Sequence, residues 1–143
     1  MISLVLITFI ALAFTASAFT NRFGLDSYEI YLNNKLVQKQ YVNQPLNLRV
    51  LALIKAKESD HLQIAYTHCM NKGTGTARSI SLKDEKGETL AKWKFADGTH
   101  AKMSIPVKEL LHWQKKKAGH ELILYYIAHE SEKEELISSV RFK

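Results

Sequence analysis

The chain lacks several features on which small exported domains often depend. Cysteine occurs once, as Cys69, so no disulfide can form within the chain. Arginine occurs at only four positions, and lysine therefore supplies most of the formal net charge of +6. There is no internal repeat and no low-complexity stretch beyond one run of three lysines. Without disulfides, the folded state must be stabilised by apolar burial and backbone pairing, for which a chain of this length suffices.

Recognisable catalytic motifs are also missing. The sequence contains no H-E-x-x-H zinc motif and no G-x-S-x-G serine motif. The segment 73–78 has two glycines but lacks the Gly-Lys-Ser/Thr ending of a phosphate loop. We therefore expect a protein that is not an enzyme and carries no cofactor, and a small hydrolase with an unfamiliar site remains an alternative.

The scarcity of arginine bears on the partner. Base readout and bidentate phosphate binding both favour arginine, so we expect no nucleic-acid partner. Lysines spread along strands often keep a sheet soluble and protect its edges. Such a basic surface also favours an anionic glycan or lipid surface, and an envelope protein is a further possible partner.

The first charged side chain is Arg22, and the preceding residues 2–14 are almost all apolar. Ala16 and Ala18 have the spacing that a signal peptidase cuts after, although no Lys or Arg precedes the apolar run. We predict a signal peptide at 1–18 and a single domain at 19–143, in a secreted or periplasmic protein. The alternative is an uncleaved anchor, which would be the chain's only association with a membrane.

The rest of the sequence has the pattern of short strands. Apolar residues alternate with polar ones over several runs, as in strands that bury one face. Asn33-Asn34 and the segment 84–87 separate two pairs of such runs and predict hairpins. The run 122–128 is apolar on both faces, which predicts a central strand buried on both sides. The predicted strands lie near residues 28–32, 36–42, 46–54, 61–68, 80–82, 90–95, 122–128 and 136–142.

One short helix interrupts the strands. Pro106 suits a first helical turn, and Val107, Leu110 and Leu111 make one apolar stripe at helical spacing. Gly119 supplies the stop after it. About seven to eight strands and one helix predict an all-β protein, an antiparallel immunoglobulin-like β-sandwich that follows an N-terminal signal helix.

Two resemblances accompany this pattern. The order of strand, short helix, glycine turn and tyrosine-rich strand is similar to the later half of immunoglobulin-like sandwiches, without their paired cysteines. The segments Phe23–Leu32 and Ser104–Leu111 resemble a group of small secreted bacterial proteins. That resemblance implies an exported bacterial domain and brings no activity or site with it.

The candidate site residues fall into two sets. His68, Cys69 and Met70 offer imidazole, thiolate and thioether, the ligands that copper prefers, and they define the alternative of a metal-binding or redox protein. Because neighbouring strand residues point to opposite faces, these three would need a strand end or loop to converge. Arg78 at a glycine loop is a candidate for anion binding, and Tyr31 for an exposed aromatic contact with a ligand. The sequence thus favours an exported, non-enzymatic binding or accessory module of the cell envelope.

Overall fold

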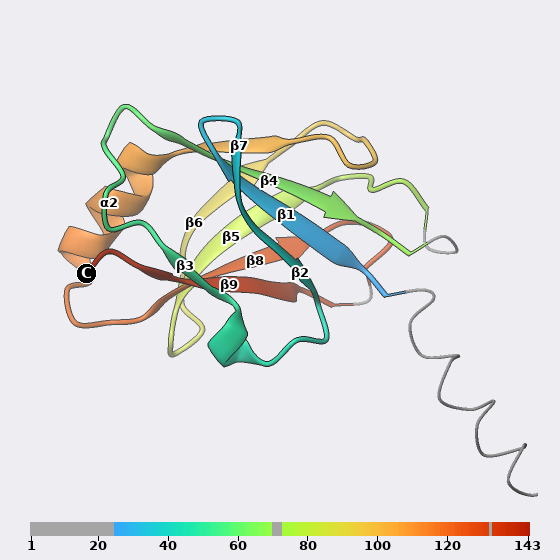
Figure 1. The fold of residues 1–143 in the computed structure, drawn as a ribbon. Coiled ribbons are helices and arrows are strands. Elements are labelled where there is room, and N and C mark those ends of the chain that lie inside the picture. Colours follow the sequence, from blue (N-terminus) through green and yellow to red (C-terminus); the bar gives the residue numbers. More distant parts are fainter. Residues whose placement is uncertain (1–24, 70–72, 132) are drawn as a thin grey trace, which may run out of the picture.

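The structure, a computed structural model, describes residues 25–69, 73–131 and 133–143. Two β-sheets lie face to face in this part of the chain, and one short α-helix lies at one end of them (Figure 1). The strands are β1 (Ser27–Leu32), β2 (Lys35–Tyr41), β3 (Val50–Ala52), β4 (His61–Thr67), β5 (Ser79–Asp84), β6 (Thr89–Lys94), β7 (Met103–Pro106), β8 (Leu122–Ile127) and β9 (Glu135–Arg141), and the helices are the 3-10 turn η1 (Leu46–Leu48) and α2 (Val107–Lys116). This arrangement confirms the predicted all-β sandwich. The predicted signal peptide at 1–18 lies outside the described residues.

The four-stranded sheet has the order β2-β1-β4-β7, and all of its strand pairs are antiparallel. Its first hairpin turns at Asn33 and Asn34, whose φ angles of 49° and 67° lie in the left-handed region. Asparagine tolerates that region better than most residues, which is why the pair predicted the turn correctly. The Asn33 side chain also donates a hydrogen bond of 2.8 Å to Asp60 and fastens the turn to the loop before β4.

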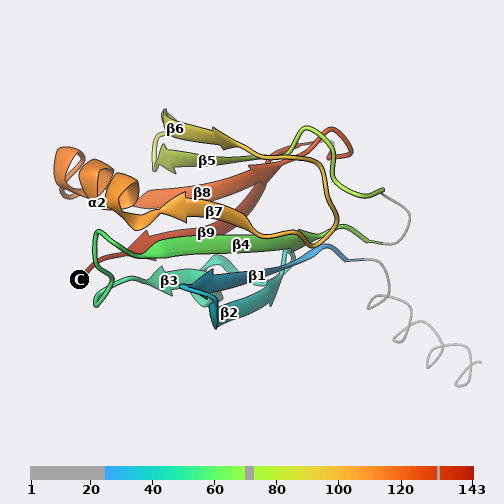
Figure 2. The same ribbon diagram turned by 90° about the horizontal axis from the view of Figure 1, so that it is seen from above.

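The five-stranded sheet has the order β3-β9-β8-β5-β6 and packs on the first sheet (Figure 2). Its pairs are antiparallel except β3 with β9, which run parallel. The prediction of a purely antiparallel sandwich is thus wrong at this one pair. The chain crosses to the second sheet through η1, and β3 then runs in the same direction as β9. The described residues hold nine strands, whereas the sequence suggested seven or eight.

Two local predictions also need correction. Alternation at 46–52 predicted one strand, but only Val50–Ala52 form it as β3, whereas Leu46–Leu48 form a 3-10 turn in which Leu48 N–H donates to Pro45 O. Leu46 and Leu48 are more than half exposed, so their alternation does not reflect a buried face. Strand β7 was not predicted, and Pro106 ends it and caps α2 from an extended conformation rather than lying inside the helix.

The core lies between the inner faces of the two sheets. Strand β8 is central in its sheet, and Leu122, Leu124 and Tyr126 on its inner face are at most 2% exposed. Its outer residues Ile123, Tyr125 and Ile127 are half-buried, so the prediction of full burial on both faces holds only for the inner one. The other fully buried large side chains include Tyr28, Ile30, Leu62, Ile64, Tyr66, Ile80, Leu82, Met103, Ile105, Leu110 and Ile137. Across the described ranges, no helix has the length and apolar character that crossing a membrane requires.

Candidate functional site

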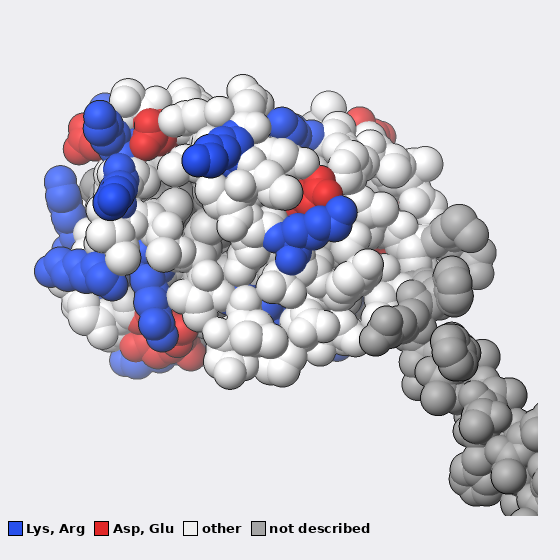
Figure 3. Space-filling model, viewed as in Figure 1, with Lys and Arg blue, Asp and Glu red and all other residues white. Residues whose placement is uncertain are grey.

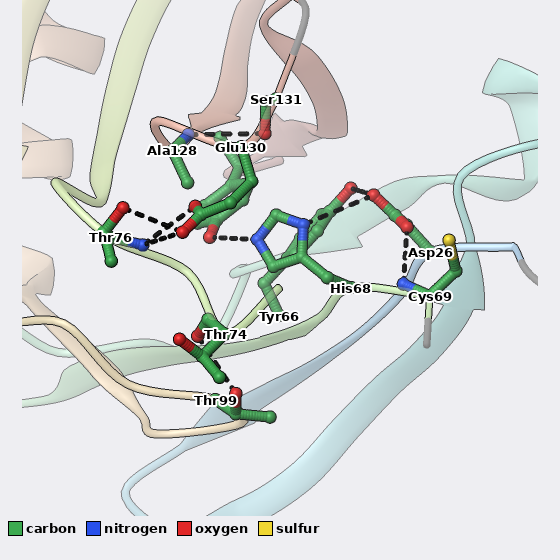
Figure 4. A network of polar contacts seen from close by, with 11 residues as sticks. Asp26, Tyr66, His68, Cys69, Thr74, Thr76, Thr99, Ala128, Glu130 and Ser131 are labelled. Carbon is green, nitrogen blue, oxygen red and sulfur yellow. Dashed lines mark hydrogen bonds and ion pairs between the residues drawn. The ribbon is translucent and has the colours of Figure 1, made fainter. Parts of the chain in front are cut away.

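A cluster of buried polar side chains joins the two sheets near the ends of β4 and β8 (Figure 4). Its members Asp26, Tyr66, His68 and Tyr126 are each at most 8% exposed. The Asp26 carboxylate accepts a hydrogen bond of 2.8 Å from the Tyr66 hydroxyl and another of 2.8 Å from the Cys69 backbone N–H. His68 Nε2 is hydrogen-bonded to the Tyr126 hydroxyl at 2.8 Å. The imidazole therefore connects the segment after β4 to the opposite sheet.

Burial determines the chemistry of this cluster. The Tyr66 and Tyr126 rings are stacked with centroids 3.9 Å apart. Burial raises the pKa of both hydroxyls, and the hydrogen bond to Asp26 raises the pKa of Tyr66 further, so both stay neutral at physiological pH. His68 Nδ1 lies 3.7 Å from Asp26 Oδ2 and has no hydrogen-bond partner among the residues that the structure describes.

The metal hypothesis rested on His68, Cys69 and Met70. The structure separates the first two, because Figure 4 shows the Cys69 sulfur on the side of Asp26 away from the imidazole. Met70 lies outside the described residues. Within the described part of the chain, no three His, Cys, Asp or Glu side chains are arranged to hold a metal ion. The hypothesis is thus left with two residues that point in different directions.

Arg78 does not lie on an exposed loop but is 3% exposed at the start of β5. Its guanidinium donates hydrogen bonds to two backbone carbonyls, at 2.6 and 2.8 Å to Ala96 and at 2.9 Å to Ala101. These bonds hold the segment after β6 against β5. The side chain therefore has a structural role, and its positive charge still contributes to the potential of the surface above it.

Tyr31 belongs to the other sheet, so the structure does not bring it together with Arg78. Its hydroxyl donates a hydrogen bond of 2.5 Å to Glu29, and the Lys102 ammonium lies 4.0 Å from its ring centroid. The hydrogen bond to Glu29 raises the pKa of the Tyr31 hydroxyl. One face of the ring is thus already in contact with a cation of the chain itself.

The glycine loop beside the cluster is held by Glu130. The carboxylate accepts hydrogen bonds of 2.9 and 3.0 Å from the Thr76 backbone N–H and of 2.8 Å from the Thr76 hydroxyl. The backbone hydrogen bond from Thr76 lowers the pKa of Glu130 by more than burial raises it. A Cβ atom added to Gly75, in the same loop, would lie 3.3 Å from the Tyr126 hydroxyl. The loop and the buried cluster therefore form one connected region.

This lowered pKa makes the loop sensitive to acid. Ionised Glu130 stabilises the folded state, because its pKa is lower there than in the unfolded chain. This contribution to the free energy of unfolding is lost as the pH falls through the folded-state pKa. We expect Glu130→Gln to lower the urea midpoint at about pH 7 and to differ much less from the parent protein at about pH 3. Glu121→Gln, at an exposed carboxyl, serves as the control. An equal gap for Glu130→Gln at both pH values would contradict this assignment.

A groove of about 410 Å³ lies where β5 begins and where β6 and β8 end. The exposed side chains of Lys92 and Lys94 project from β6 on its outer face, and His129 borders it from the end of β8. Arg78 and Ser79 are also part of its lining, with Phe95 and Ile127 as apolar members. The groove thus combines cations with a partly apolar floor, and the described residues that line it include no carboxylate.

The four-stranded sheet presents a different surface. In Figure 3 the charged side chains leave a broad area over η1 and the lower end of β2 nearly free of charge. All of the large apolar side chains that are exposed in the described residues come from residues 25–54: Leu25, Leu36, Val37, Tyr41, Leu46, Leu48 and Ile54. The cationic groove belongs to the five-stranded sheet, whereas Leu36, Val37 and Tyr41 of the apolar set lie on β2 of the other sheet.

The sequence contained only part of the signal for these sites. Lys92 and Lys94 alternate with Trp93 and Phe95, so their common face was predictable. Their position beside His129 was not, because the two segments are brought together only by the pairing of β5 with both β6 and β8. Asp26 and Tyr126 carried no motif that would connect them to His68.

Comparisons with protein-family models, curated proteins and solved structures return no match. The resemblance to small secreted bacterial proteins therefore gains no support from them. The proposals that follow rest on the chain's own geometry and charge.

Proposed function

We propose that this chain is an exported, non-enzymatic protein of the cell envelope, secreted or periplasmic, that binds an anionic glycan through the outer face of its five-stranded sheet. In this proposal residues 1–18 are a cleaved signal peptide and 19–143 a single binding domain. The observation that carries the proposal is the groove bordered by Lys92, Lys94 and His129. Its volume of about 410 Å³ lies in the usual range for small-ligand sites.

The proposal includes an immunoglobulin-like topology. The order of β1-β4-β7 in one sheet and β9-β8-β5-β6 in the other supports it, since immunoglobulin domains distribute their successive strands in this way. The helix between β7 and β8 agrees with that comparison. The groove then lies on the sheet to which variable-type domains add their extra strands.

A glycan is favoured over a lipid surface because of where the apolar side chains lie. Binding to a bilayer needs apolar residues that project beside the cations. The exposed apolar side chains, such as Leu46 and Leu48, lie near η1 and β2 rather than beside Lys92 and Lys94. A recessed cationic groove suits an acidic group carried on a polar chain, because the lysines complement its charge and the rim stays hydrated.

Charge reversal in the groove tests the proposal. We expect the double variant Lys92→Glu/Lys94→Glu to bind polygalacturonate at least about tenfold more weakly in low salt, because two attractive charges become repulsive. The matched variant Lys55→Glu/Lys57→Glu changes the net charge equally on an exposed loop and should change the affinity less than about twofold. Isothermal titration calorimetry measures both.

Two results would refute this function. An equal loss in the two double variants would show that binding follows the net charge and not the groove. Binding of anionic vesicles, in the absence of any glycan, with the same dependence on Lys92 and Lys94 would make the partner a lipid surface.

A further inference from the structure

A second hollow lies on the same outer face as the groove. It has a volume of about 260 Å³ and lies beside β9 and the start of β8. Its lining comes from η1, β3, β8 and β9 and consists of Leu46, Asn47, Val50, Glu121, Ile123, Leu136, Ser139 and Arg141. Of these lining residues, Arg141 carries a positive charge and Glu121 a negative one.

Strand β8 connects the two hollows. Ile127 lines the first and Ile123 the second, and Tyr125 lies between them on the same face because side chains alternate along a strand. All three are half-buried, so they form a partly apolar floor. The four steps along the strand from Ile123 to Ile127 span about 13 Å at about 3.3 Å per residue.

Strand register places two lysines of β6 level with one end of this floor. Ser79 is the partner of both Lys94 and Ile127, and Ser81 is the partner of both Lys92 and Tyr125. The outer face therefore has cross-strand rows, each of which begins with a lysine on β6 and ends on β8. Neighbouring rows are about 6.6 Å apart, two residues along the strand.

The middle of the floor is nearly neutral. The Lys83 ammonium lies 5.2 Å from the Tyr125 ring centroid and forms an ion pair with Glu134. Positive charge is therefore concentrated at the end that carries Lys92 and Lys94, and Arg141 marks the other end.

We infer that the ligand is a linear acidic oligosaccharide that lies along β8 and occupies both hollows, with Tyr125 beneath its middle. This inference rests on the proposed function and extends it from one acidic group to a chain. A single sugar fills one hollow and leaves the other empty. An extended peptide fits this surface less well, because its backbone N–H and C=O groups would lie over side chains rather than against a sheet edge. Sugar hydroxyls, in contrast, match the short polar side chain of Ser139, which lines the second hollow and is only half-buried.

A length series of ligands tests the inference. Oligogalacturonates of one to six units are titrated into the parent protein and followed by calorimetry. We expect the affinity to rise about tenfold or more from the monomer to the longer members and then to level off, because each further contact is made by a chain that is already bound. Arg141→Ala should remove this gain and leave binding of the monomer within about twofold, since the residue lies at the far hollow.

Variants of Tyr125 test the contribution of the partly apolar floor independently of the charged residues. We expect Tyr125→Ala to flatten the length series while Tyr125→Phe preserves it, because the ring and not the hydroxyl makes the contact. Tyr41→Ala, on the outer edge of the other sheet, is the control and should leave the series unchanged. Thermal melts of all variants confirm that each one is folded at the temperature of titration.

The outcomes distinguish this inference from the function on which it rests. The inference that one ligand occupies both hollows is overturned if no member of the series binds. It is also overturned if the monomer binds as tightly as the longest member. The groove proposal survives in the second case, provided that Lys92→Glu/Lys94→Glu still weakens binding. If that double variant binds normally, the proposed function itself fails.

Discussion

Replacement of Asp26 by alanine is expected to lower the free energy of unfolding by about 3 kcal/mol, within a range of about 2–5 kcal/mol. The carboxylate is 6% exposed and accepts hydrogen bonds from the Tyr66 hydroxyl and the Cys69 backbone N–H. The substitution leaves the buried Tyr66 hydroxyl and the partly buried Cys69 N–H without an acceptor, and each such donor costs about 1–3 kcal/mol. Urea denaturation at neutral pH measures the difference.

Two further variants apportion this loss. Tyr66→Phe removes one donor together with its bond and should cost about 1 kcal/mol, since no buried polar group is orphaned on the tyrosine side. The double variant Asp26→Ala/Tyr66→Phe should then be less destabilised than the sum of the two single ones, because the groups share one interaction. A loss below about 1 kcal/mol for Asp26→Ala would show that water replaces the carboxylate and that the cluster does not hold the sheets together.

Gly75→Ala is expected to cost about 2–4 kcal/mol, the second largest effect among these predictions. Gly75 has a φ of +82°, where a residue with a Cβ is strained by about 1–2 kcal/mol. A Cβ atom there would also lie 3.1 Å from Arg78 Cδ and 3.3 Å from both the Gly98 carbonyl oxygen and the Tyr126 hydroxyl. The carbonyl is backbone and cannot move aside alone, so the close contact adds to the strain.

Gly87→Ala is the matched control. Its φ of +83° is nearly the same, but no atom lies within 4 Å of the added Cβ. It should therefore cost only the strain, about 1–2 kcal/mol. The difference between the two variants measures how tightly the glycine loop packs on Arg78 and Tyr126. Equal losses would mean that the loop moves away without penalty.

Local patterns in the sequence predicted most of the fold. The Asn33-Asn34 turn was predictable because the left-handed φ angles of a tight hairpin favour asparagine. The stripe of Val107 and Leu110 predicted the helix because helical spacing places both residues on one face, and both are buried. Alternation failed at Leu46–Leu48, where exposed leucines in a single 3-10 turn repeat the pattern of a strand.

The candidate sites were less accessible to prediction from the sequence, for a physical reason. Asp26, Tyr66 and Tyr126 come from three strands or strand ends, and their hydrogen bonds join residues 40 to 58 positions apart. Arg78 had the surroundings of a loop cation, but its charge is directed at the carbonyls of Ala96 and Ala101 across the β5–β6 pair. The sequence specifies which side chains are present, while cross-strand register decides which of them meet.

The last strand, β9, has a consequence for how the chain reaches its native state. Its residues bond to the beginning of the domain: the Tyr28 hydroxyl donates to Ile137 O across 109 positions, and the Ser138 hydroxyl donates to Arg49 O across 89. Contacts so distant in sequence give a high contact order, which slows folding. The two sheets cannot close until the C-terminal residues are available. A chain that is translocated from its N-terminus would therefore remain open throughout its passage and fold only after its last strand has emerged.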